Sequence, residues 1–98
     1  MNHKSNILFI TGIITAINDA TQGETWQKQS FVLKTNSKFP TEICFYAWNQ
    51  VIDQLSRCRL NDIVTVYFNP ESKFYQEKYY TELKAWKIEI NFVKNENI

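Results

Sequence analysis

Glu42-Ile-Cys-Phe-Tyr-Ala-Trp-Asn-Gln-Val-Ile-Asp-Gln-Leu-Ser56 decides the fold, because the spacing of its apolar residues changes from strand-like to helix-like partway along. The first half alternates, which predicts a strand over residues 41–48. Its inward face is expected to carry Ile43, Phe45 and Ala47, and its outward face Cys44, Tyr46 and Trp48.

The second half of this stretch predicts one short helix. Asn49 is a plausible N-cap, and Val51, Ile52 and Leu55 follow it at helical spacing. The helix is expected to end near Ser56 and to connect two strands.

Working outward, the same period-two pattern predicts four more strands, at residues 7–17, 26–35, 63–69 and 78–92. Loops are expected at 18–25 and 70–77, and turns at 36–40 and 61–62. Gly12 lies in mid-strand, where a barrel strand often bends or bulges. Phe31 and Leu33 are expected to face the core.

This order of elements predicts an all-β fold, a five-stranded OB-fold barrel with one short helix between strands three and four. An SH3-like barrel has the same strand count, but at that place it normally carries only a 3₁₀ turn. The 98 residues suit one OB domain spanning 1–98, with an ordered core at about 7–92 and short flexible termini.

Composition excludes several classes of protein. No apolar stretch approaches the ~20 residues needed to span a bilayer, and the apolar run near the amino terminus is too short for a secretory signal. A cytoplasmic protein with no membrane partner is therefore expected. Two cysteines, Cys44 and Cys58, make neither a disulfide scaffold nor a zinc knuckle. The net charge of +1 is uninformative about partners.

Catalytic patterns are weak, so no enzyme activity, cofactor, metal or small-molecule substrate is expected. The sole histidine, His3, lies in the amino terminus, and neither cysteine has a base partner in the sequence. With two glycines in the chain there is no glycine-rich phosphate loop. Three acidic residues that follow in the second half of the chain, Glu71, Glu77 and Glu82, are interpreted as scattered and solvated, and not as a metal site.

Three segments carry a family resemblance. Cys44-Phe-Tyr-Ala-Trp-Asn, Leu60-Asn-Asp-Ile-Val-Thr-Val-Tyr and Lys78-Tyr-Tyr-Thr-Glu-Leu-Lys-Ala follow in the order seen in bacterial single-stranded-DNA-binding proteins, which the chain resembles. The turn glycine of that family is missing at Asn61. Trp26-Gln-Lys-Gln-Ser-Phe-Val-Leu is similar to an uncharacterised family of short OB-fold proteins from bacteria and phages, a domain of unknown function, and this is the closer match. The resemblance covers roughly residues 7–90.

The resemblance implies which rings stack on bases. The aromatic at the end of the third strand falls on Trp48, and the one in the loop between the last two strands falls on Tyr75, with Phe74 adjacent. A third stacking tryptophan falls on Glu42, so that contact is lost, or replaced by Trp26. No acidic-aromatic tail tip that recruits partners is expected.

The residues that alternation turns outward also have the chemistry that binding of a single strand requires. Non-specific binding of single strands needs rings for stacking and cations for phosphates. The predicted nucleic-acid-binding residues are Trp26, Lys28, Lys34, Tyr46, Trp48, Lys73, Phe74, Tyr75, Lys78, Tyr80 and Lys84. Trp26 and Trp48 could instead cover a barrel end or a subunit contact. Trp86 is equally compatible with the core and with contact, because a bulge there would exchange the two faces.

The leading hypothesis is non-sequence-specific binding of single-stranded DNA, with RNA also possible, in replication, recombination or repair by a bacterial or phage homo-oligomer (dimer or tetramer). The alternative is an OB-fold protein-interaction module, which self-associates or binds a partner without binding nucleic acid. RNA binding of the cold-shock kind ranks last, because the aromatic strand motif of that family is missing.

Overall fold

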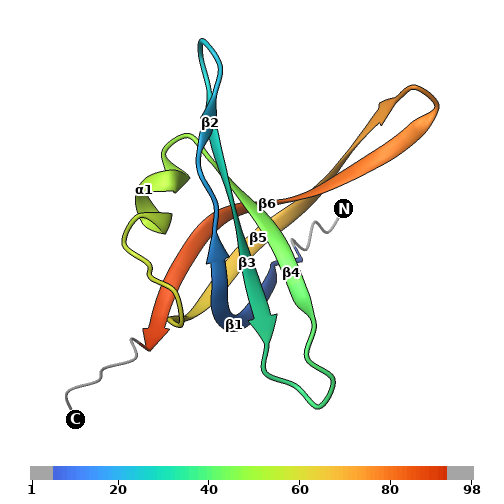
Figure 1. The fold of residues 1–98 in the computed structure, drawn as a ribbon. Coiled ribbons are helices and arrows are strands. Elements are labelled where there is room, and N and C mark those ends of the chain that lie inside the picture. The colour runs from blue at the N-terminus through green and yellow to red at the C-terminus, as the bar shows by residue number, and fades with distance from the viewer. Residues whose placement is uncertain (1–5, 93–98) are drawn as a thin grey trace, which may run out of the picture.

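Long curved strands close on one another around an apolar core (Figure 1). The computed structural model describes residues 6–92. Its elements are β1 (Leu8–Ile17), β2 (Thr21–Gln22), β3 (Gln27–Thr35), β4 (Glu42–Trp48), α1 (Val51–Leu55), β5 (Ile63–Tyr75) and β6 (Lys78–Phe92). The predicted succession of three long strands, a short helix and two long strands is confirmed.

The strands form a closed ring. Their order is β1-β5-β6-β4-β3-β2, and β1 also pairs with β3. All neighbours run antiparallel except β4 and β6, which meet in parallel through two register pairs, Tyr46 with Lys84 and Ala47 with Ala85. We call this short parallel contact the seam. Among the five long strands it is the shortest ladder, because each of their other pairings has at least five register pairs.

Gly12 marks the place where β1 passes from one partner to the other, since it pairs with Val64 of β5 and with Thr35 of β3. A Cβ atom at this position would lie 2.7 Å from the backbone oxygen of Lys34. The absence of a side chain therefore permits the close approach. The register shift of β1 against β3 lies slightly further on, between Ile14 and Ala16.

Alternation fixes the core as predicted on β3 and β4. Phe31, Leu33, Phe45 and Ala47 are fully buried, while Ile43 is partly buried. The rings of Phe31 and Phe45 stack with centroids 5.6 Å apart. Other buried members of the core include Ile14, Leu55, Val64, Val66 and Phe68.

The prediction that Asn49 caps α1 was wrong. Asn49 has a φ of 51°, and its side-chain oxygen accepts the backbone N–H of Gln27 at 3.0 Å. That side chain therefore ties the end of β4 to the start of β3 instead of capping a helix. Gln50 is the N-cap, without a side-chain cap bond, and Ser56 ends the helix as expected.

Two predicted loops contain strands. Residues 18–25 include β2, which pairs with the start of β3. Residues 70–77 do not form a loop, because β5 runs on to Tyr75 and turns into β6 through Gln76 and Glu77, with φ of 49° and 65°. We call residues 70–83 the ribbon. It projects from the ring at the upper right of Figure 1, and because most of its residues are exposed on both faces it shows no apolar alternation.

The predicted turn at residues 61–62 is present. Asn61 adopts a φ of 76° where the resembling family has glycine, a conformation that asparagine tolerates better than most residues. Asp62 is buried and accepts the backbone N–H of Arg59 at 2.9 Å. The missing glycine is thus replaced without loss of the turn.

Both cysteines are free thiols, and Cys44 is exposed while Cys58 is buried. His3 and residues 94–98, for which mobility was predicted, lie outside the described residues. Within residues 6–92, no helix has the length and apolar character that crossing a bilayer requires.

Candidate nucleic-acid interface

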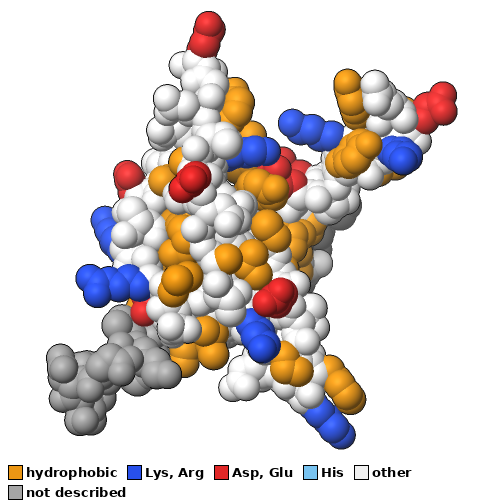
Figure 2. Space-filling model, viewed as in Figure 1, with side chains coloured by type: hydrophobic (Ala, Val, Ile, Leu, Met, Phe, Trp, Pro, Cys, Tyr) orange, Lys and Arg blue, Asp and Glu red, His pale blue; other side chains and the backbone are white. Residues whose placement is uncertain are grey.

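A groove of about 540 Å³ lies over the seam, between the body of the ring and the ribbon. In the space-filling view the surface is hollowed between the ribbon and the β2–β3 hairpin, and Lys or Arg side chains lie at the hollow (Figure 2). β3 contributes Lys28, β4 contributes Tyr46 and Trp48, and the ribbon with the adjoining part of β6 contributes Glu71, Lys73, Tyr80, Thr81, Glu82 and Lys84. We call this the groove.

Strand register assembles the groove. Lys28 of β3 is paired with Trp48 of β4, and Tyr46 of β4 is paired with Lys84 of β6. Directly paired residues lie on the same face of a sheet. The alternation that buries Phe45 and Ala47 therefore turns Tyr46 and Trp48 outward, beside the two lysines.

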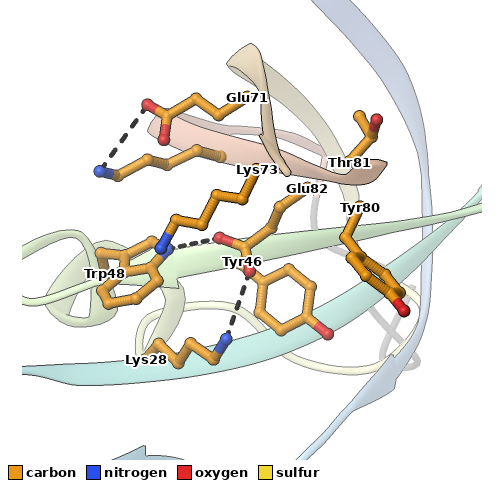
Figure 3. A pocket seen from close by; sticks show the side chains of 9 residues that line it. Lys28, Tyr46, Trp48, Glu71, Lys73, Tyr80, Thr81 and Glu82 are labelled. Atoms are coloured by element: carbon orange, nitrogen blue, oxygen red, sulfur yellow. Dashed lines mark hydrogen bonds and ion pairs between the residues drawn. The ribbon is translucent and has the colours of Figure 1, made fainter. Parts of the chain in front are cut away.

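Glu82 is the centre of the polar contacts in the groove (Figure 3). Its Oε1 atom accepts a hydrogen bond from Trp48 Nε1 at 2.8 Å, and its Oε2 atom lies 3.2 Å from Lys28 Nζ. The side chains of Lys28 and Glu82 are 30% and 27% exposed. Water therefore screens the attraction between their charges only in part. One carboxylate thus fixes the edge of the indole ring and one of the cations.

Lysines also lie against the rings of the groove. Lys28 Nζ is 4.7 Å from the centroid of Tyr46 and 5.1 Å from that of Trp48, and Lys84 Nζ is 5.3 Å from the centroid of Trp48. Such cation–π contacts at partly exposed sites contribute roughly 0.5–1 kcal/mol. They are weak enough for a nucleobase to displace the cation from the ring.

The acids balance most of the positive charge of the groove. Lys84 pairs loosely with Glu71 at 3.9 Å, whereas Lys73 has no carboxylate within ion-pair distance among the residues that the structure describes. Burial, with a smaller contribution from Glu82, raises the pKa of the Cys44 thiol. Cys44 shares the outward face of β4 and stays protonated at neutral pH, which argues against its acting as a nucleophile.

Six of the predicted binding residues meet in the groove, and five do not. Those in the groove are Lys28, Tyr46, Trp48, Lys73, Tyr80 and Lys84. Trp26 packs beside it, with its ring 5.7 Å from that of Trp48. Lys34 lies six residues further along β3 than Lys28, about 20 Å away. It is paired there with Glu42.

The other three predicted residues, Phe74, Tyr75 and Lys78, lie on the ribbon but outside the groove. Phe74 is paired with Tyr79, and their rings are 4.9 Å apart. Because successive residues alternate between faces, Phe74 faces away from Lys73 and from the groove. Tyr75 and Lys78 are paired at the far end of the ribbon, beyond the residues that line the groove.

Sequence reasoning missed the acids of the groove. Glu71 and Glu82 were interpreted as solvated, yet both line it, together with Thr81. A signal was present, since Thr81 and Glu82 belong to the segment Lys78-Tyr-Tyr-Thr-Glu-Leu-Lys-Ala that carries the family resemblance. Their position beside β4 depends on the seam, which no local pattern reveals.

Trp86 lies in the bulge that the sequence suggested. Tyr67 of β5 pairs with Lys87, while the next residue, Phe68, pairs with Ala85, so Trp86 is the extra residue. Its side chain is 42% exposed, and its ring lies 5.5 Å from that of Tyr67. Trp86 is therefore a surface residue and not part of the core.

The fold is similar to that of several solved structures. The SSB domain of a Synechococcus sp. protein matches with a TM-score of 0.69 at 18% identity, over 91% of this chain and 99% of that chain. The second single-stranded DNA binding protein of Mycobacterium smegmatis matches with a TM-score of 0.69 at 14% identity, over 96% and 98%. Plasmodium falciparum SSB, solved in complex with ssDNA, matches with a TM-score of 0.56 at 18% identity, over 96% and 100%.

Identities this low establish the fold alone, and they confirm the predicted all-β OB fold class. No curated protein matches the chain in sequence. A family model does match, over residues 9–89. Since that match spans most of the chain, the protein belongs to the family described as a domain of unknown function, DUF3127.

Proposed function

We propose that this protein binds single-stranded DNA without sequence specificity, through bases stacked on Tyr46, Trp48 and Tyr80 and phosphates held by Lys28, Lys73 and Lys84. The observation that supports the proposal is that one groove gathers three rings and three cations from separate strands. The same fold occurs in proteins whose names record binding of single-stranded DNA.

The chemistry of the groove fits a single strand better than a duplex. Stacking needs an unpaired base with a free face and contributes ~1–3 kcal/mol per base, whatever the base. Lys28 and Lys84 now contact Glu82 and Glu71, so phosphates would compete with those carboxylates. We therefore expect moderate affinity that falls as the salt concentration rises.

The proposal covers binding and not catalysis. Protection of exposed strands during replication, recombination or repair in the cytoplasm of a bacterial cell is the role that such binding would serve. We expect DNA to be preferred to RNA, with RNA binding as a weaker second activity.

The test is a titration of intrinsic tryptophan fluorescence with oligo-dT at several salt concentrations, with a duplex of equal length as control. Strong quenching by the single strand, which weakens with salt, is the expected result. Trp48→Ala should reduce affinity by about 5- to 150-fold, the equivalent of one stacked base. The control is Phe74→Ala, which removes an exposed ring that faces away from the groove. No binding at low salt by the folded protein would refute the proposal.

A second candidate function, self-association, is favoured by the edge of β1. Residues 8–11 pair with β5, and their other edge has no strand partner among the described residues. Ile7, Leu8 and Phe9 beside it are 59%, 40% and 58% exposed. Unpaired edges with apolar side chains readily accept a strand from another chain. Sedimentation of the protein without DNA distinguishes the monomer from the expected dimer or tetramer, and Leu8→Lys should shift the equilibrium toward the monomer.

A further inference from the structure

A second cavity, of about 300 Å³, adjoins the groove. It shares Trp48, Glu71 and Lys84 with the groove, and Trp86 lines it as well. The two hollows are therefore continuous over the outer surface around the seam. The volume is at the lower end of the range of small-molecule sites, which suits one planar ring system.

Trp86 lies in the β6 bulge and lines this cavity. Regular alternation after the buried Ala85 would leave one outward residue before the next buried one, but here both Trp86 and Lys87 are exposed before Ile88 is buried. Bulges commonly redirect a side chain next to a binding site. Trp86 keeps 42% of its surface exposed, although a tryptophan in a small core would normally be covered.

The other groups that line the cavity can bind a nucleobase and its phosphate. Lys84 lies between the two hollows, with its Nζ atom 5.3 Å from the ring of Trp48 and its only ion-pair partner in residues 6–92 at 3.9 Å. The side-chain amides of Asn69 and Gln50 line the cavity and make no hydrogen bond within the described part of the chain. Amides can both donate to and accept from the edge of a base.

We infer that this cavity is a second nucleobase site, in which a base of a strand leaving the groove stacks on Trp86 while Lys84 holds the phosphate between the two sites. This inference rests on the proposed function. It assigns a binding role to Trp86, Asn69 and Gln50, and it gives the bound strand a direction, from the ribbon across the seam toward α1.

Two single-tryptophan proteins test the inference. Trp26→Phe with Trp48→Phe leaves Trp86 as the only tryptophan, and Trp26→Phe with Trp86→Phe leaves Trp48. Each is titrated with oligo-dT of about 4 and about 16 nucleotides, the range of site sizes of OB folds, with labelled-oligonucleotide anisotropy as an independent measure of binding. Emission of Trp48 should be quenched by both lengths, and emission of Trp86 by the longer one.

A substitution of Trp86 tests the same inference through the binding affinity. Trp86→Leu should lower the affinity for the longer strand by about 5- to 150-fold, as expected for the loss of one stacked base, and leave the affinity for the short strand unchanged. Phe74→Leu, with a comparable loss of an exposed ring, should change neither.

Quenching of Trp48 but not of Trp86 by a saturating long strand would overturn the inference and leave the proposed function intact. Absence of binding by anisotropy in every folded variant would overturn both. A change in Trp86 emission that follows protein concentration and not DNA would overturn the inference in favour of a contact between copies of the chain.

Discussion

Glu82→Gln should strengthen binding of single-stranded DNA. The substitution keeps a side-chain oxygen for the hydrogen bond from Trp48 Nε1, now 2.8 Å long, but removes the charge that holds Lys28 at 3.2 Å. Lys28 becomes free to meet a phosphate, and the phosphate no longer faces a carboxylate.

The expected gain in binding free energy follows from the distance between Glu82 and the incoming phosphate. A phosphate that replaces the carboxylate as the partner of Lys28 would lie roughly 5 Å from Glu82, where two unit charges repel by about 0.8 kcal/mol in water and by several kcal/mol in a drier setting. Because both side chains are about 70% buried, with 30% and 27% exposure, we expect a gain of about 1–2 kcal/mol, or about 5- to 30-fold in affinity. Release of one lysine should also steepen the plot of log K against log salt by about 0.7.

Fluorescence anisotropy of labelled oligo-dT over a range of salt concentrations measures both quantities. Glu77→Gln is the matched control, since it makes the same change of charge at the ribbon turn, away from the groove. Loss of a partly exposed ion pair costs roughly 0–1 kcal/mol, so the melting temperature should change little. Weaker binding by a folded Glu82→Gln protein, or a salt slope equal to that of the control, would refute the reasoning.

Two further results are expected from other parts of the molecule. Gly12→Ala should destabilise the fold by about 1–3 kcal/mol, because the new Cβ would lie 2.7 Å from the backbone oxygen of Lys34. The melting temperature should fall by about 4–24 °C, and an unchanged melting curve would contradict this close approach. A thiol reagent should modify Cys44 in the folded protein and Cys58 only after unfolding, since they are exposed and buried respectively. The reaction at Cys44 should be slow at neutral pH and accelerate in alkali, because burial and Glu82 raise its pKa and the thiolate is the reactive form; equal labelling of both thiols at neutral pH would be the contrary result.

The sequence was sufficient for the elements that face the core. Phe31, Leu33, Phe45 and Ala47 alternate because one side of each strand is buried, and the pattern predicted both their strands and their burial. The ribbon is exposed on both faces, so its sequence does not alternate, and the pattern of residues 70–77 predicts a loop where the structure has two strands. The side chain of Asn49 was misassigned because its partner, the backbone of Gln27, belongs to a different strand.

The sequence pattern predicted which residues of the candidate site face outward on each strand, but not which strands lie side by side. Alternation correctly put Lys28 on the outward face of β3 and Tyr46 and Trp48 on the outward face of β4, and the strand register makes them neighbours. It could not place β6 beside β4, so Glu82 was missed. Alternation also put Lys34 on the same face as Lys28, but it could not show which end of β3 lies at the groove, because that depends on where β6 meets β4.

The seam has a thermodynamic consequence. Only two register pairs join β4 to β6, so local opening of the ring should cost least here, and short ladders of this kind exchange their amide hydrogens before the core does. Glu82 reaches across the seam to Trp48 and Lys28. A ligand in the groove would likewise contact residues of β4 and of β6, and would hold the two strands together. Since it binds the closed ring and not the open one, ligand at a hundredfold excess over its Kd would add about 2.7 kcal/mol to the stability of the closed form. Amide exchange at the seam would thus report occupancy of the groove without any label on the ligand.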